Sequence, residues 1–156
     1  MSEHAAPSQR AAGSESRFAQ VGGLRLHYLE WGRPEAPPIV LLHGGGQSAH
    51  TWQRVAGRLQ RRYRLIAPVA RGHSDHPESR LGPEDLWAAA ARVPCSALVV
   101  HGSESDILSR DAGQRLAGVL PHGRYVSVAG SGHSVQGDNP HSLSEAIEQF
   151  LAEIGY

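Results

Sequence analysis

The sequence predicts a single α/β domain, layered around a mostly parallel sheet of about six strands. Two continuous apolar runs, at residues 39–42 and 97–100, are typical of strands that helices cover on both faces. Strand-like and helix-like segments alternate along the chain with short connections, as in strand–helix–strand units with right-handed crossovers. These two observations predict the fold class before any motif is considered.

The chain is expected to begin with a tail and a β-hairpin. Residues 1–17 contain no apolar stretch, so we predict a flexible tail that buries too little surface to become ordered. Residues 18–21 and 24–31 flank Gly22 and Gly23, and apolar and polar residues alternate in the second segment. Residues 18–156 are therefore assigned to one minimal domain, whose sheet is expected to be parallel except at its first strand.

The remaining elements follow from hydrophobic periodicity and from the positions of Gly and Pro. Further strands are predicted at 63–67 and 125–128. Residues 69–81 read as a polar, turn-rich loop. Helices are predicted at about 51–59, from 82 to shortly before Pro94, near 111–120 and at about 143–154.

The composition argues against several classes of partner. Fifteen basic and fifteen acidic residues balance, which favours neither nucleic acid nor an anionic membrane. No apolar run approaches membrane-spanning length, and the N-terminus lacks the apolar core of a secretory signal. The single cysteine, Cys95, cannot form an internal disulfide and begins an apolar run, so we predict a small core residue. A cytoplasmic location without a cofactor is expected.

Five short motifs follow one another at the predicted strands. They are V-G-G-L-R-L-H-Y-L-E-W-G (21–32), I-V-L-L-H-G-G-G (39–46), A-R-G-H (70–73), A-L-V-V-H-G-S-E-S-D-I-L (97–108) and V-A-G-S-G-H-S-V (128–135). In this order they resemble the α/β-hydrolase superfamily, specifically its esterase, C–C hydrolase and haloperoxidase-like branch. The resemblance covers nearly everything from Phe18 onward and implies a truncated α/β-hydrolase fold.

The central part of the family pattern is missing. After A-R-G-H the family has a strand, a G-x-S-x-G turn, a helix, another strand and usually a cap, whereas here only residues 74–83 occupy that place. No G-x-S-x-G occurs anywhere in the chain, and Val69 replaces the family's acid before R-G-H. The resemblance therefore implies an internal deletion that removed the usual nucleophile.

The resemblance implies that other parts of an active site survive. Gly44, Gly45 and Gly46 form the oxyanion loop, in which glycine lets backbone N–H groups approach a developing negative charge. The alternative is a tight turn that binds no ligand. Asp106 is the acid that would orient a histidine, and His133 is that histidine. An imidazole, whose ordinary pKa is near neutral, suits general-base work.

Each of these two residues has a structural alternative. Asp106 could be a loop residue that caps the next helix, although Ser109 or Asp111 is better placed to do so. His133 could be an exposed loop histidine, one of ten histidines in the chain. His73 and His76 have no third partner in the sequence, so no metal site is expected.

Several serines compete for the nucleophile. Ser74 lies in G-H-S after a strand, although a shortened form of the family's loop explains it better. If the strand at 97–100 pairs directly with that at 39–42, Ser103 or Ser105 would lie beside the glycine loop and near His133. Ser131 and Ser134 flank the histidine but are not expected to present a hydroxyl to its ring. These alternatives remain open.

The sequence thus predicts a small esterase-like serine hydrolase for short-chain or activated carboxylic esters. The alternative is a catalytically impaired scaffold that acts as a binding or oligomerisation module; haloperoxidase- or C–C hydrolase-like chemistry would need the same missing serine. Loss of inner strands exposes apolar sheet edges, which either pair with each other or pair with another chain. A homo-oligomer formed through these edges is expected.

Overall fold

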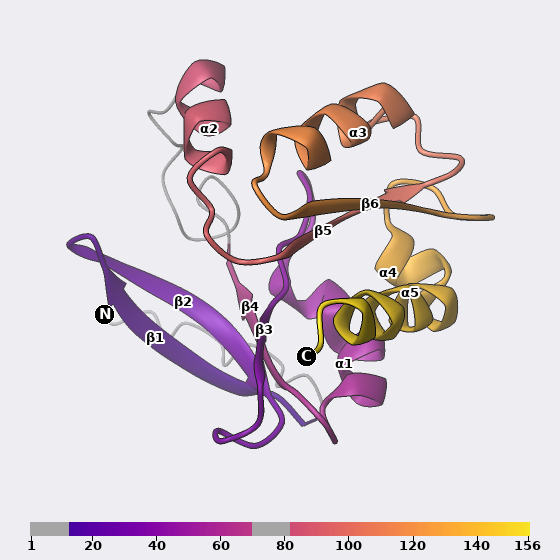
Figure 1. The fold of residues 1–156 in the computed structure, drawn as a ribbon. Coiled ribbons are helices and arrows are strands. Elements are labelled where there is room, and N and C mark those ends of the chain that lie inside the picture. The colour runs from indigo at the N-terminus through magenta and orange to yellow at the C-terminus, as the bar shows by residue number, and fades with distance from the viewer. Residues whose placement is uncertain (1–12, 70–81) are drawn as a thin grey trace, which may run out of the picture.

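The computed structural model describes residues 13–69 and 82–156, and arranges them as two β-sheets with helices packed around them (Figure 1). In chain order the elements are β1 (Glu15–Val21), β2 (Leu24–Trp31), β3 (Pro38–Val40), the 3-10 helix η1 (Ala49–Trp52), α1 (Gln53–Leu59), β4 (Arg64–Pro68), α2 (Pro83–Ala90), β5 (Ala97–Gly102), α3 (Arg110–Val119), β6 (Gly123–Val128), α4 (Val135–Asp138) and α5 (Pro140–Glu153).

The larger sheet has the strand order β1-β2-β4-β3. The predicted hairpin is confirmed: Gly22 and Gly23 turn the chain with φ angles of +57° and +78°, a region that favours glycine. β1 begins at Glu15, so residues 15–17 belong to the hairpin and not to the tail. β2 is antiparallel to both β1 and β4, while β3 is parallel to β4. The strand that runs against the others in this sheet is therefore β2, not the first strand, because the chain reverses at the hairpin and again between β2 and β3.

The smaller sheet consists of β5 and β6, paired in parallel. Figure 1 shows α3 on one face of this pair and α4 and α5 on the other. Ser109 begins α3 by accepting a hydrogen bond from the Ala112 N–H at 3.2 Å, as its position before the helix predicts. Cys95, just before β5, is exposed and is not the core residue that the sequence predicts.

Both sheets contribute to one hydrophobic core. The most deeply buried large residues come from the larger sheet and from helices α1 and α5, and Leu98 and Val100 of β5 pack against them. Because that core is shared, the fold does not divide into two domains. Among its members with at most 2 % exposure are Trp31, Val55, Leu59, Leu65 and Leu143.

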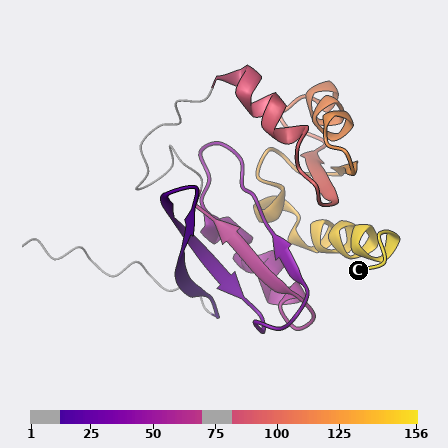
Figure 2. The same cartoon turned by 60° about the vertical axis from the view of Figure 1, so that its left-hand side comes forward.

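The two sheets do not join. Within the described residues β3 and β5 share no ladder, so the direct pairing considered from the sequence is not formed. β3 offers only three residues, while β5 is held between α3 on one face and α4 with α5 on the other. The free edge of β3 lies on the side of β5 (Figure 2), and Val40 and Leu42 there are 59% and 72% exposed. No described strand pairs with this edge, although the Tyr156 hydroxyl donates to the Pro38 carbonyl oxygen of β3 at 2.7 Å.

None of the helices within residues 13–69 and 82–156 is long and apolar enough to cross a membrane.

Candidate active site

Three loops meet at one end of the sheets, and each follows the carboxyl end of a strand. The loop after β3 contributes Gly44, the loop after β5 contributes Ser105, and the loop after β6 contributes His133. In α/β sheets, ligands bind outside the carboxyl ends of the strands. A cavity of about 190 Å³ lies between these loops, and its walls include Trp52, Val100 and the three residues above, together with Gln47 and Gln136.

The His133 ring is fixed between two backbone loops. Its Nδ1 lies 3.5 Å from the Ser105 Oγ, at the limit of a hydrogen bond. Its Nε2 is buried and has no hydrogen-bond partner within the described part of the chain. A Cβ atom built on Gly44 would lie only 2.8 Å from this Nε2, so the ring rests directly against the glycine backbone. The absence of a side chain at Gly44 makes the histidine's position possible.

The predicted acid does not reach the histidine. Asp106 is exposed, and its carboxylate makes no hydrogen bond or ion pair with the described residues. Ser105 turns inward instead: its Oγ accepts a hydrogen bond from the Leu108 N–H at 3.1 Å while contacting His133. This short turn directs Asp106 toward solvent, where its charge stays hydrated. The predicted Asp106–His133 hydrogen bond is therefore not formed in this structure.

The glycine loop is held by a network of amide side chains. The Gly44 N–H donates to the Gln47 Oε1 at 3.2 Å, so this donor is already occupied. The Gln136 Nε2 donates to the same oxygen at 2.5 Å and to the Thr51 Oγ1 at 3.2 Å. Gly45 and Gly46 are exposed, and a Cβ on either would meet nothing within 4 Å. Of the three predicted glycines, only Gly44 is in contact with His133.

The sequence did not identify Gln47, Thr51 or Gln136 as site residues. None belongs to a motif that specifies its chemistry, and all three are brought together by folding, since Gln136 is more than 80 positions from the other two. Gln136, in α4, is only 5% exposed, whereas glutamine side chains are mostly exposed in folded proteins. No signal in a single sequence would have found this network.

The candidate nucleophiles are separated by the fold. Ser74 lies outside the described residues. Ser103 is exposed, and its Oγ accepts a hydrogen bond from the Gly130 N–H at 3.1 Å, so it ties two loops together away from the histidine ring. Its predicted place beside the glycine loop required β5 to pair with β3, which does not happen. Ser131 is buried and donates to the Ala129 carbonyl oxygen at 3.4 Å. Ser105 is the described serine whose hydroxyl contacts His133.

A second buried histidine has a structural explanation. His101, in β5, is 3% exposed, and its ring nitrogens lie 3.0 Å from the Leu108 carbonyl oxygen and 3.3 Å from the Ser127 Oγ. Both nitrogens are thus satisfied, as a core histidine requires. In the part of the chain that the structure describes, no three His, Cys, Asp or Glu side chains converge to hold a metal ion. His73 and His76 lie outside that part.

Among the curated proteins of related sequence are one named as a magnesium-chelatase subunit and several named as hydrolases, although no family model matches the chain. The chain is 28% identical over 109 residues to a magnesium-chelatase 30 kDa subunit of Rhodobacter capsulatus, covering 65% of this chain and 38% of that protein. It is 43% identical over 54 residues to the 2-hydroxy-6-oxo-6-(2'-aminophenyl)hexa-2,4-dienoic acid hydrolase of Metapseudomonas resinovorans. This match covers 33% of this chain and 18% of that protein. It is 38% identical over 69 residues to an AB hydrolase superfamily protein of Bacillus subtilis, and this match covers 42% of this chain and 24% of that protein. The matches span well under half of each relative.

Solved structures share the fold at low identity. E-2-(acetamidomethylene)succinate hydrolase superimposes with a TM-score of 0.67 and 14% identity, over 89% of this chain and 99% of that chain. A carboxylesterase of Bacillus subtilis superimposes with a TM-score of 0.64 and 12% identity, over 88% of this chain and 91% of that chain. At these identities the likeness concerns the fold alone, which confirms a truncated α/β-hydrolase fold. The partial sequence matches to named hydrolases support the same superfamily as this fold.

Proposed function

We propose that the protein is a small hydrolase of short-chain or activated carboxylic esters, with His133 as its general base. One observation carries this proposal: the Nε2 of His133, a residue that lines the cavity, is buried beside the glycine loop and has no partner among the described residues. A buried polar atom without a partner costs free energy, so its retention suits an atom that bonds to a ligand.

The proposed proton path follows from the hydrogen bond at the other ring nitrogen. When Nδ1 carries the proton and donates to the Ser105 Oγ, Nε2 keeps its lone pair and can accept a proton. His133 then takes a proton from the attacking water or serine hydroxyl, whose oxygen adds to the ester carbonyl carbon. The same proton passes to the departing alcohol. In this assignment Ser105 positions the ring, and the exposed Gly45 offers its N–H group to the oxyanion.

Hydrolysis of p-nitrophenyl acetate tests the role of the histidine. We expect His133→Ala to lower kcat/KM by about 100-fold or more, the usual contribution of a general base. His122→Ala is the matched control, because His122 is exposed and lies outside the cavity. Equal rates for the wild-type protein and His133→Ala would reject the proposal. Asp106→Asn in the same assay tests whether the exposed carboxylate contributes after a movement of its loop.

The attacking group is identified by labelling with a serine-directed fluorophosphonate. Stoichiometric labelling, followed by peptide mapping, distinguishes five candidates: Ser74, Ser103, Ser105, Ser131 and Ser134. Activity without any labelled serine would instead indicate that His133 activates water directly. Labelling of Ser105 would contradict its assignment as a positioning residue.

The open sheet edge favours a second candidate function. Val40 and Leu42 are exposed at the edge of β3, next to backbone groups that no described strand pairs with. Such an edge is a template for another strand, and the same edge on a second copy could pair with it antiparallel about a two-fold axis. On this proposal the chain is a scaffold that assembles through β3. Light scattering coupled to size-exclusion chromatography at micromolar concentration is the test, and a clean monomer would exclude it.

A further inference from the structure

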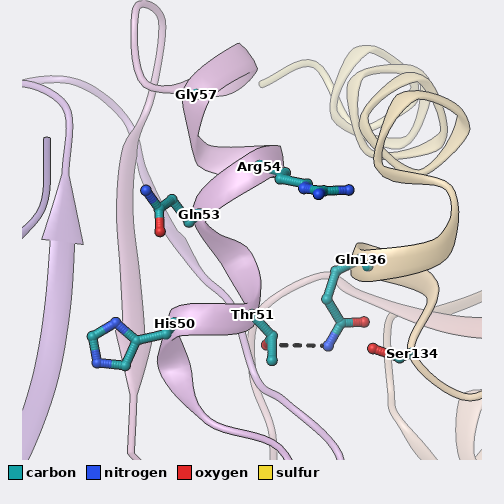
Figure 3. A pocket seen from close by; sticks show the side chains of 8 residues that line it. His50, Thr51, Gln53, Arg54, Gly57, Ser134 and Gln136 are labelled. Atoms are coloured by element: carbon teal, nitrogen blue, oxygen red, sulfur yellow. Dashed lines mark hydrogen bonds between the residues drawn. The ribbon is translucent and has the colours of Figure 1, made fainter. Parts of the chain in front are cut away.

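A second hollow lies between the segment η1–α1 and helix α4 (Figure 3). Its volume is about 630 Å³, more than three times that of the cavity at His133. One side is formed by His50, Thr51, Gln53, Arg54 and Gly57, and the other side by Ser134, Gln136 and Gly137. We call this hollow the α1–α4 cleft.

The polar groups of the α1–α4 cleft suit an anion. Arg54 supplies a permanent positive charge, and Figure 3 shows its side chain extending from α1 toward the side of α4. The Arg54 guanidinium makes no ion pair or hydrogen bond with the described residues, and no Asp or Glu lines the cleft. The hydroxyl of Ser134 adds a possible donor, whereas the Thr51 hydroxyl already donates to the Ser48 carbonyl oxygen at 2.7 Å. A planar guanidinium can bind a carboxylate through two parallel hydrogen bonds.

The α1–α4 cleft is next to the candidate active site. Gln136 lines both hollows, and its Nε2 hydrogen-bonds to Gln47 at the His133 cavity and to Thr51 at the cleft (Figure 3). Ser134, in the cleft, directly follows His133 in the chain. The Gln136 side chain is therefore shared by the two hollows, which places the α1–α4 cleft directly beside the His133 cavity.

We propose that the α1–α4 cleft binds a carboxylate group of the substrate through Arg54, so that the preferred substrates are esters that carry a free acid group a few atoms from the ester carbonyl. This inference rests on the proposed ester hydrolase function. Arg54 holds the acid group while the ester carbonyl lies at His133. Positioning by a distant charged group improves the alignment of the reacting atoms and discriminates against neutral esters.

Kinetics with two esters of similar shape test this selectivity. Mono-p-nitrophenyl succinate carries the acid group, and p-nitrophenyl butyrate is its neutral counterpart. We expect Arg54→Gln to lower kcat/KM for the succinate ester by about tenfold and to leave kcat/KM for the butyrate ester unchanged. Arg58→Gln is the matched control, because Arg58 lies one turn further along α1, is exposed and does not line the cleft. Equal effects of Arg54→Gln on both esters, or equal effects of the two variants, would overturn the proposal.

Binding of succinate tests the cleft without any reaction. Titration of the isotope-labelled protein with sodium succinate should shift the amide signals of Arg54, Ser134, Gln136 and Gly137 in a saturable manner. Arg54→Gln should weaken this binding by about tenfold, whereas Arg58→Gln should not. Absence of saturable shifts in the wild-type protein would overturn the proposal, and tighter binding of inorganic phosphate than of succinate would overturn the carboxylate assignment. Succinate binding without hydrolysis of either ester would reject the proposed function and leave the carboxylate site standing.

Discussion

His133 and Gly44 come from loops about 90 positions apart in the sequence. Because Gly44 has no side chain, the His133 ring can pack directly against its backbone. The imidazole rests where a side chain on Gly44 would be, and its Nε2 has no partner among the described residues. Gly44 thus has a steric role as well as a place in the glycine loop. At this scale the site depends on one close approach between a ring and a backbone.

Substitution of Gly44 tests this contact. Gly44→Ala places a methyl group 2.8 Å from the His133 Nε2, so either the ring or the loop must move. We expect a loss of about 1–3 kcal/mol in the free energy of unfolding, the usual cost of overpacking. The His133 ring signals should shift in a nitrogen-detected NMR spectrum. Gly45→Ala, whose methyl group meets nothing, should leave both the stability and the ring signals unchanged. Unshifted ring signals in Gly44→Ala would contradict the contact.

Ser105, and not its neighbour Asp106, contacts the Nδ1 of His133. The sequence favours Asp106 as the group that orients the histidine, yet the hydroxyl of Ser105 occupies that place and the carboxylate faces solvent. The turn closed by the Leu108 N–H decides between them, because it directs one side chain inward and the next outward. The orientation of single side chains in a loop depends on such local bonds.

At the scale of elements, an ion pair network holds the strands of the larger sheet together. Glu30 of β2 is 3% exposed, and its carboxylate lies 2.8 Å from the Arg17 Nε of β1 and 2.5 Å from the Arg64 Nε of β4. A hydrogen bond with Glu15 and the attraction of Glu30 raise the pKa of Arg17 above its ordinary value. Stability gained from this shift is lost only as the pH rises above the arginine range, so it is present at neutral pH.

Removal of the central carboxylate should loosen these three strands. We expect Glu30→Ala to lower the free energy of unfolding by about 2–3 kcal/mol, near the lower end for buried pairs because both arginines stay partly exposed. Urea denaturation followed by circular dichroism measures this change. Glu15→Ala is the matched control: its carboxylate is exposed, and its pairing with Arg17 should contribute less than about 1 kcal/mol. Similar losses in both variants would contradict a special role of Glu30.

At the scale of the whole molecule, the two sheets are joined by their core and not by backbone hydrogen bonds. Ile39 of β3 and both Leu98 and Val100 of β5 pack against the same buried cluster. Side chains therefore connect the two halves on which the site depends. Within residues 13–69 and 82–156 no second strand pairs with β3, so association through this edge can be tested on the complete molecule.

The edge of β3 can be tested for association. If copies pair through this edge, Leu42→Lys should shift the protein toward monomer by at least tenfold in dissociation constant, because a charged residue at a strand edge opposes pairing. Sedimentation velocity over a range of concentrations measures this shift. Leu86→Lys in α2 removes a comparably exposed apolar side chain away from the edge and should have no effect. Equal association of all three proteins would show that β3 is not the interface.

Much of this architecture was predicted from the sequence. Apolar runs and glycine turns predicted the hairpin, six strands and the four longer helices, because these features depend on local periodicity. The motifs at strand ends predicted the α/β-hydrolase fold and brought Gly44 and His133 into consideration together. The short helix α4 and the start of β1 at Glu15 were missed, since neither has a clear apolar pattern.

The sequence alone determined the fold class, the order of the elements and the absence of the G-x-S-x-G turn, since local residue patterns encode all three. Only the tertiary structure decided how the halves meet: β3 and β5 stay apart, Ser103 turns away from the histidine, and Gln136 joins the two hollows. These outcomes depend on packing between segments far apart in the chain. A pattern in one segment holds no information on which distant surface will cover it.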